Sequence, residues 1–163
     1  MNKNLSFPRP SLQDPRVAFA TWFGVGYSPF APGTTGSIVA ALLAWPISQY
    51  LGVIGFFVII IVTLLLGVWA SEHYVRVSGQ EDSPAIVVDE VAGQWLTLVL
   101  IPPDIIYYVL GFVIFRIIDI IKPWPISFLD RRVKGGFGVM LDDCIGGILA
   151  CLIIWNIWMM TNL

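Results

Sequence analysis

The sequence is poor in charged residues, in histidine and in cysteine, and each shortage excludes a class of protein. Charged residues make up 12% of the 163 positions, against roughly 25% in ordinary soluble domains. A soluble fold of this length could not bury so much apolar surface, so the excess is expected to face lipid. The single histidine, His73, and the two cysteines, Cys144 and Cys151, do not supply the ligand set of a usual zinc site. On one helix the cysteines would lie about two turns apart, too far for a disulfide.

Several catalytic motifs are also missing. The glycine-rich segment 24–37 is not followed by the Gly-Lys-Ser/Thr of a Walker loop. The chain contains no Cys-x₅-Arg loop of cysteine phosphatases and no Asp-x-Asp-x-Thr stretch of haloacid-type enzymes. His73 stands beside Glu72 with no recognisable motif around it, so a histidine nucleophile is not expected.

In place of these features the chain has long apolar runs. Hydrophobic residues make up 57% of it, and a membrane-spanning helix needs roughly 20 mostly apolar residues. The runs predict an all-α fold, a polytopic transmembrane helical bundle of four or five spans, with five preferred. A break at Pro46 is the alternative to a complete first span. The expected helices cover residues 37–52, 53–70, 87–101, 104–121 and 143–160.

Residues 1–163 are expected to form one domain. Residues 1–36 would be an N-terminal cytoplasmic, interfacial segment with a glycine-rich loop, and residues 37–163 the helical bundle. With the N-terminus in the cytoplasm and five spans, all nine Lys and Arg residues fall on the cytoplasmic side, as the positive-inside rule requires. They are Lys3, Arg9, Arg16, Arg76, Arg116, Lys122, Arg131, Arg132 and Lys134.

Carboxylates gather at the cytoplasmic ends of different expected helices. Asp89 and Glu90 begin the third, Asp119 ends the fourth, and Asp142 and Asp143 begin the fifth. Acidic residues also favour helix N-termini for their dipole alone, which is the simpler interpretation. Adjacent acids repel unless a cation or a base lies between them, however, and the dipole disfavours an acid at a helix C-terminus. Oxygen ligands without a Cys/His set suit Mg²⁺ or Mn²⁺.

Small residues follow these acids at helical spacing. Gly93 lies one turn after Asp89, and Gly146 and Gly147 lie one turn after Asp142 and Asp143. Such glycines let membrane helices approach closely. We therefore expect them to bring the acids together.

Three further features could bind an anion. Segment 24–37 presents glycines and the hydroxyls of Thr34, Thr35 and Ser37 directly before a helix, which suits an anion, although a simple loop capped by Ser37 is the alternative. Arg116 and Lys122 each stand three residues from Asp119, as phosphate-binding cations or as an interfacial ion pair with snorkelling side chains. The basic loop 130–138, with Arg131 and Arg132, could hold an anionic headgroup or only carry the positive-inside signal.

Four blocks of the sequence resemble the phosphatidylglycerophosphatase A family. They are GVGYSPFAPGTTGS (24–37), IVVDEVAG (86–93), FRIIDIIKPWPI (115–126) and GGFGVMLDDCIGG (135–147). Ile118 stands where an aromatic is usual, and Gly146-Gly147 replaces a more usual Ala-Gly, but neither change touches a group able to bind metal or phosphate. The resemblance implies a multi-pass phosphatase of the bacterial inner membrane that acts in phospholipid biosynthesis. It would use Mg²⁺ to hydrolyse the terminal phosphomonoester of phosphatidylglycerophosphate to phosphatidylglycerol and inorganic phosphate.

The residues and the resemblance together assign roles. The expected metal ligands are Asp89, Glu90, Asp119, Asp142 and Asp143. The expected catalytic residues are Asp89, Glu90, Asp119, Lys122 and Asp143, with Asp143 or Glu90 accepting a proton from water. The expected substrate-binding residues are Thr34, Thr35, Ser37, Arg116, Lys122, Arg131 and Arg132. The expected cofactor is Mg²⁺, and the expected partners are the lipid substrate and the bilayer, with no nucleic acid.

Two alternative functions stay open, together with a second chemical route. A phosphatase for another lipid, such as a polyprenyl phosphate, could use the same scaffold. A divalent-cation transporter could use the acids as ion ligands, although transport sites usually lie near the bilayer midplane and these acids lie at one surface. A covalent aspartyl-phosphate is the less favoured route for the phosphatase.

Overall fold

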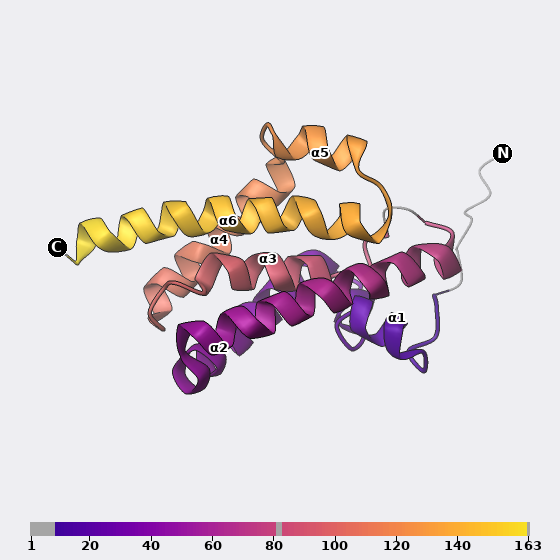
Figure 1. Cartoon of the computed structure of the whole chain (residues 1–163), viewed down its shortest axis with the longest axis horizontal. Coiled ribbons are helices and arrows are strands. Elements are labelled where there is room, and N and C mark those ends of the chain that lie inside the picture. The colour runs from indigo at the N-terminus through magenta and orange to yellow at the C-terminus, as the bar shows by residue number, and fades with distance from the viewer. Residues whose placement is uncertain (1–8, 81–82, 163) are drawn as a thin grey trace.

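The computed structural model describes residues 9–80 and 83–162, which form helices and no strands (Figure 1). The expectation of an all-α fold is therefore confirmed for these residues. The elements in chain order are α1 (Pro15–Ala20), the 3₁₀ turn η1 (Val25–Tyr27), α2 (Pro32–Ser78), α3 (Val88–Leu98), α4 (Ile105–Ile121), α5 (Ile126–Arg132) and α6 (Gly135–Thr161).

Helix α2 contains the first two expected helices, which join at Gly52. Gly52 has φ 62° and ψ −175°, so the helical backbone is interrupted there, and glycine adopts positive φ at no steric cost. Figure 1 shows the chain turning back within α2. Pro46 lies inside the helix without ending it. The expected helix start at Ser37 was wrong, because α2 begins at Pro32, and it continues to Ser78 through a stretch expected to be a loop.

Helices α2 and α6 are the two described helices long and apolar enough to cross a membrane. Helix α3 differs from the spanning helix expected over 87–101. Its 11 residues rise only about 16 Å, short of the roughly 30 Å hydrocarbon core. Most of its side chains are buried, and it packs against α2, α4 and α6. It is therefore a central core helix, and the number of complete spans stays a prediction.

Two glycines set the distance between α3 and α6. A Cβ atom on Gly147 would overlap the backbone oxygen of Gly93, and one on Gly93 would lie 2.7 Å from the backbone oxygen of Asp143. Both positions therefore need glycine, as the sequence predicted. Gly146 differs, because a Cβ there would be 3.5 Å from the Ile118 side chain, an ordinary contact.

Helix α6 begins well before the expected residue 143. Its first turn packs on α2, where the backbone N–H of Gly136 donates to Glu72 Oε2 at 2.8 Å. Asp142 and Asp143 are consequently not at the helix start, as expected, but in its third turn. The helix dipole acts mainly within the first turn, so it does not explain why acids stand at these two positions.

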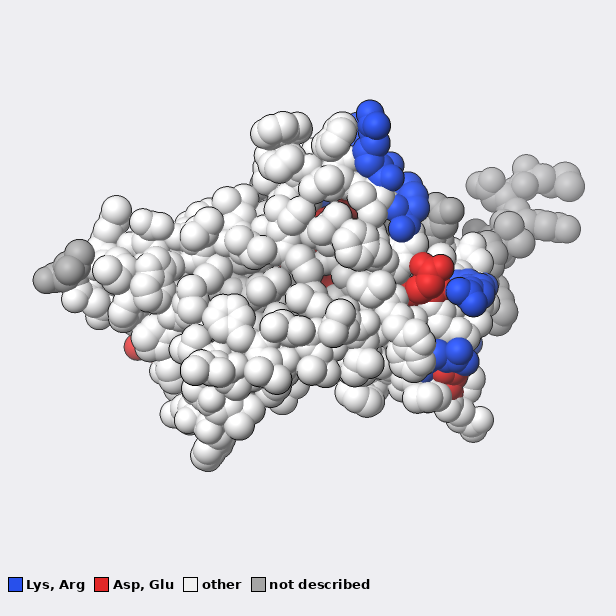
Figure 2. All heavy atoms as spheres, viewed as in Figure 1, with Lys and Arg blue, Asp and Glu red and all other residues white. Residues whose placement is uncertain are grey.

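The basic residues on the viewed face gather toward one end of the molecule (Figure 2). The blue atoms lie over α5, the start of α6 and the end of α2, while the opposite end of this face shows none. This asymmetry supports the expected orientation, which itself stays a prediction. Lys3 lies outside the described residues.

Candidate active site

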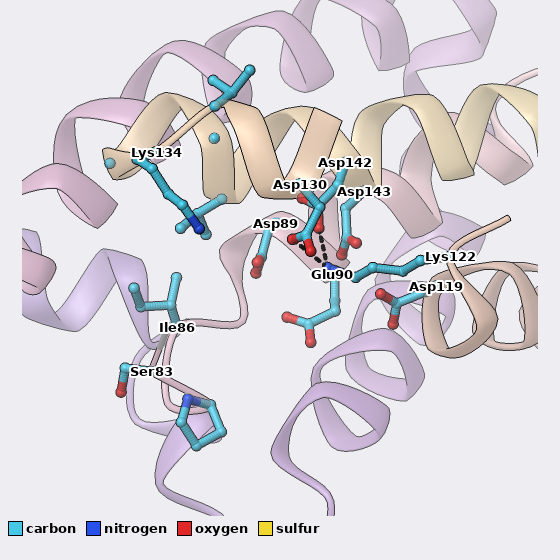
Figure 3. A pocket seen from close by; sticks show the side chains of 15 residues that line it. Ser83, Ile86, Asp89, Glu90, Asp119, Lys122, Asp130, Lys134, Asp142 and Asp143 are labelled. Atoms are coloured by element: carbon cyan, nitrogen blue, oxygen red, sulfur yellow. Dashed lines mark hydrogen bonds and ion pairs between the residues drawn. The ribbon is translucent and has the colours of Figure 1, made fainter. Parts of the chain in front are cut away.

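Carboxylates from α3, α4, α5 and α6 line one cavity of about 220 Å³. It lies near the end of the molecule where the basic residues gather, and Figure 3 shows most of its acidic side chains directed toward one another. Its charged lining residues are Asp89, Glu90, Asp119, Lys122, Asp130, Lys134, Asp142 and Asp143. The helix ends that the sequence placed on one side of the bilayer therefore converge on one polar cavity.

Three of these acids form a cluster that could hold a cation. Asp89, Glu90 and Asp143 each offer one carboxylate oxygen, and the three oxygens lie within 4.8 Å of one another. Each residue also has a buried oxygen without a hydrogen-bond partner among the described residues: Asp89 Oδ1, Glu90 Oε2 and Asp143 Oδ2. Carboxylates this close repel strongly in a medium of low dielectric constant, and a bound cation would relieve the repulsion. An all-oxygen donor set fits Mg²⁺.

Asp142 lies beside this cluster but is engaged by Lys122. Its Oδ2 forms an ion pair with Lys122 Nζ, which also donates to Asp130 Oδ1 at 2.8 Å. Asp142 Oδ1 is buried and lacks a partner within the described chain. Lys122 follows α4 in the left-handed conformation, with φ 45°, which strains a residue other than glycine. A strained backbone thus holds the ammonium group between two acids at the cavity wall.

The same contacts hold Lys122 and Asp130 in their charged forms. Burial alone would lower the pKa of Lys122, but its hydrogen bonds to Asp130 and Asp142 outweigh burial and raise that pKa above its ordinary value. The hydrogen bond from Lys122 holds the pKa of Asp130 below its ordinary value. Lys122 is therefore a cation at neutral pH, as binding of an anion requires.

Arg116 connects the acids to helix α2. Its NH1 atom lies 2.5 Å from Asp119 Oδ2 and 3.8 Å from Glu90 Oε1, and it donates to Ser37 Oγ at 3.4 Å. Arg116 and Asp119 are both largely buried, with side chains 14% and 12% exposed. Asp119 thus forms its ion pair with Arg116, and it also lines the cavity.

Segment 24–37 approaches the site from the side of Glu90. A Cβ on Gly33 would overlap Glu90 Oε1 and lie 3.4 Å from Arg116 NH1, so the first turn of α2 lies directly against both. Ser37 does not cap the helix, because its hydroxyl donates to Gly33 O within α2. Thr34, Thr35 and Ser37 are not among the described residues that line the cavity.

Arg131 and Arg132 are placed elsewhere. Both are exposed on α5, where Arg131 Nε donates to Ser127 O at 3.1 Å and the Arg132 guanidinium lies 5.0 Å from the centre of the Phe128 ring. They border a separate surface hollow. Lys134 was not singled out from the sequence, yet it lines the acidic cavity. Its place in the basic loop 130–138, directly before Gly135-Gly136, was the signal that could have indicated this.

Comparison with known proteins identifies the family of the chain. Residues 18–158 match the family described as phosphatidylglycerophosphatase A. A protein named phosphatidylglycerophosphatase A from Escherichia coli K12 is 36% identical, covering 96% of this chain and 91% of the relative. Its counterpart from Haemophilus influenzae is 34% identical, covering 98% and 100%.

A third relative carries a different name. A Bacteroides thetaiotaomicron protein, provisionally named a phosphatidylinositol-3-phosphatase, is 34% identical over 90% of this chain and 94% of its own length. No solved structure matches the chain. The curated relatives thus agree on removal of phosphate from a lipid and differ in the lipid headgroup that their names specify.

Proposed function

The chain belongs to the phosphatidylglycerophosphatase A family of phosphoric monoester hydrolases, and we propose that it converts phosphatidylglycerophosphate to phosphatidylglycerol and inorganic phosphate with Mg²⁺ as cofactor. One observation carries the proposal. Buried carboxylate oxygens of Asp89, Glu90 and Asp143, which have no hydrogen-bond partner within residues 9–80 and 83–162, converge beside the cationic Lys122. Metal-assisted phosphate hydrolysis needs this combination of oxygen ligands and a cation for the phosphoryl group.

The residues divide the chemistry among them. Asp89, Glu90 and Asp143 would hold the ion, with Asp119 and Asp142 beside them. When bound, Mg²⁺ supplies charge neutralisation at the phosphoryl oxygens and acidifies water in the site. Lys122 stabilises negative charge on the phosphoryl group, and the first turn of α2, which lies against Glu90 and Arg116, adds a favourable dipole from behind these residues.

Hydrolysis then requires one proton acceptor and one proton donor. Glu90 or Asp143 accepts a proton as water attacks phosphorus. The bond from phosphorus to the headgroup oxygen breaks, and the same carboxylic acid returns its proton to that oxygen, which leaves as the hydroxyl of phosphatidylglycerol. Asp142 and Asp130 hold the Lys122 ammonium group in place at the cavity wall during the reaction.

The site is proposed to lie at the cytoplasmic face of a bacterial inner membrane, in a multi-pass protein with a cytoplasmic N-terminus. Two apolar helices of sufficient length support membrane insertion. The acidic cavity lies near the end where basic residues gather on the viewed face, and cytoplasmic ends of membrane proteins carry this excess. A lipid phosphate at the interface would then meet the cavity without leaving the bilayer.

Removal of divalent metal tests the reaction. The purified protein in detergent should release phosphate from phosphatidylglycerophosphate with Mg²⁺, lose that activity in a chelator, and regain it when Mg²⁺ is restored. Asp104→Asn is a suitable control, because Asp104 is exposed and caps α4. This variant should behave as the wild type. Unchanged release of phosphate in the chelator would refute the requirement for a divalent metal. No release of phosphate from folded protein would refute phosphatidylglycerophosphate as the substrate.

A second candidate differs only in the lipid headgroup. The Bacteroides relative, with its different name, favours testing a phosphatase of another lipid phosphate. A panel of phosphatidylglycerophosphate, phosphatidylinositol 3-phosphate, phosphatidic acid and a polyprenyl phosphate should be compared at equal mole fraction in mixed micelles. We expect kcat/KM to be highest for phosphatidylglycerophosphate by about tenfold or more, because headgroup contacts of a few kcal/mol discriminate at this level. A higher value for another lipid would reassign the substrate while leaving the chemistry intact.

A further inference from the structure

An apolar groove of about 390 Å³ lies between the first half of α2 and helix α4. Its residues recur at helical spacing, so each helix contributes one continuous face. They include Ile38, Leu42 and Trp45 from α2 and Tyr108, Val109 and Phe112 from α4. The groove is open to the surroundings, since Leu42 is 70% and Val109 is 52% exposed.

Both walls of the groove end at the candidate active site. Ile38 directly follows Ser37, whose hydroxyl accepts a hydrogen bond from Arg116. Phe112 lies one turn before Arg116 on the same helix. Arg116 in turn contacts Glu90 and Asp119. The end of the groove formed by Ile38 and Phe112 therefore lies next to Ser37 and Arg116, and Arg116 contacts the acids of the polar site.

The dimensions of the groove suit one hydrocarbon chain. From Ile38 to Pro46 helix α2 rises about 12 Å, close to the roughly 15 Å of hydrocarbon in one leaflet. This wall belongs to the first half of α2, before the interruption at Gly52. A lipid whose phosphate lies beside Glu90 must pass its acyl chains from the polar site into an apolar region, and the groove begins where that transition is needed.

We propose that the groove between α2 and α4 holds one acyl chain of the lipid phosphate substrate, with the glycerol end of the chain beside Ser37 and Arg116. The inference rests on the proposed function, because it needs a lipid substrate. The surrounding bilayer is as apolar as the groove, so the groove adds little affinity. Its effect is to orient the phosphate toward the carboxylates, and a misplacement of about 1 Å can cost on the order of a hundredfold in rate.

A matched pair of tryptophan variants tests the proposal. Leu42→Trp places bulk in the groove, whereas Leu65→Trp places the same bulk on the second half of α2, outside the residues that line the groove. The two leucines are equally exposed, at 70% and 69%. Leu42→Trp should lower kcat/KM for a long-chain substrate by roughly tenfold or more. It should leave a dibutyryl analogue unaffected, because its acyl groups end before Leu42. Leu65→Trp should change neither value.

The groove assignment would be overturned if Leu42→Trp lowered kcat/KM equally for the long-chain and the dibutyryl substrate. It would also be overturned if Leu42→Trp and Leu65→Trp had equal effects. A direct readout complements the kinetics. A long-chain lipid phosphate with a photoreactive group in mid-chain should label residues 38–46 and 105–112 of the wild type in detergent, and unlabelled long-chain lipid should compete. Labelling spread over all apolar faces would contradict the proposal.

The two proposals fail differently. If the groove assignment is wrong, wild-type release of phosphate and its dependence on Mg²⁺ remain, and only the chain-length and labelling results change. If the headgroup assignment is wrong, the same pair of variants is compared with the lipid phosphate that the wild type does cleave. If no lipid phosphate is cleaved, the labelling experiment alone decides whether a chain occupies the groove.

Discussion

Asp143→Asn is expected to lower phosphate release by at least about a hundredfold, because losing only an outer partner of a metal ligand already costs roughly 10- to 100-fold. Asp143 is the member of the cluster contributed by α6, and it is almost completely buried, at 4% exposure. Neutralising it removes the negative charge of one ligand and one candidate proton acceptor while keeping the shape of the side chain. The measurement is kcat with saturating Mg²⁺, together with Mg²⁺ affinity.

A stability measurement separates loss of the ion site from loss of the fold. Without divalent metal, the variant should unfold at the same temperature as the wild type or higher, because it has one charge fewer among three close carboxylates. With Mg²⁺, the wild type should gain thermal stability and the variant should gain less. Asp104→Asn, at the exposed cap of α4, should match the wild type in every respect, since Asn also caps helices well. Near-normal turnover by Asp143→Asn would remove Asp143 from the site.

Gly147→Ala is expected to destabilise the fold strongly. A Cβ at this position would overlap the backbone oxygen of Gly93 and lie 2.9 Å from its Cα. Backbone atoms cannot move aside as a flexible side chain can, so α3 and α6 must separate. Overpacking of a core typically costs about 1–3 kcal/mol and occasionally more, and we expect the upper part of that range. Thermal unfolding in detergent measures the loss.

The neighbouring glycine supplies the control. Gly146→Ala adds the same methyl group to the same helix, but its Cβ would be 3.5 Å from the nearest side chain. It should be neutral or stabilise by up to about 1 kcal/mol, because alanine favours a helix over glycine. Equal unfolding temperatures for the two variants would show that the contact between α3 and α6 is not close.

The Gly147 substitution should also reduce activity in the protein that remains folded. Asp89 and Glu90 lie on α3 and Asp143 on α6, so the distance between these helices sets the distances within the cluster. Moving the helices apart would spread the three oxygens that now lie within 4.8 Å. Loss of Mg²⁺ affinity in folded Gly147→Ala, without loss in Gly146→Ala, is therefore the expected result.

The amino-acid sequence by itself determined the helical class, the family and most of the charged residues that line the cavity. Apolar runs report helices locally, and the four long blocks carry the family resemblance without any knowledge of packing. The acids were recognisable because two adjacent pairs at expected helix starts repel one another, and because Asp119 stands at a helix C-terminus, where the dipole disfavours it. Gly93 and Gly147 were recognisable because small residues at helical spacing after those acids indicate close helix contact.

The tertiary structure decided which partner each of these acids has. It grouped Asp89, Glu90 and Asp143, paired Asp142 with Lys122 and Asp119 with Arg116, and placed Arg131 and Arg132 on another surface. It also shortened the third expected helix to a buried core helix and started α6 at Gly135. The physical reason is that periodicity shows which face of a helix is apolar but not what lies opposite that face. Here the partner of each acid depends on how closely α3 approaches α6, and on the left-handed turn at Lys122, and both are properties of the packed chain.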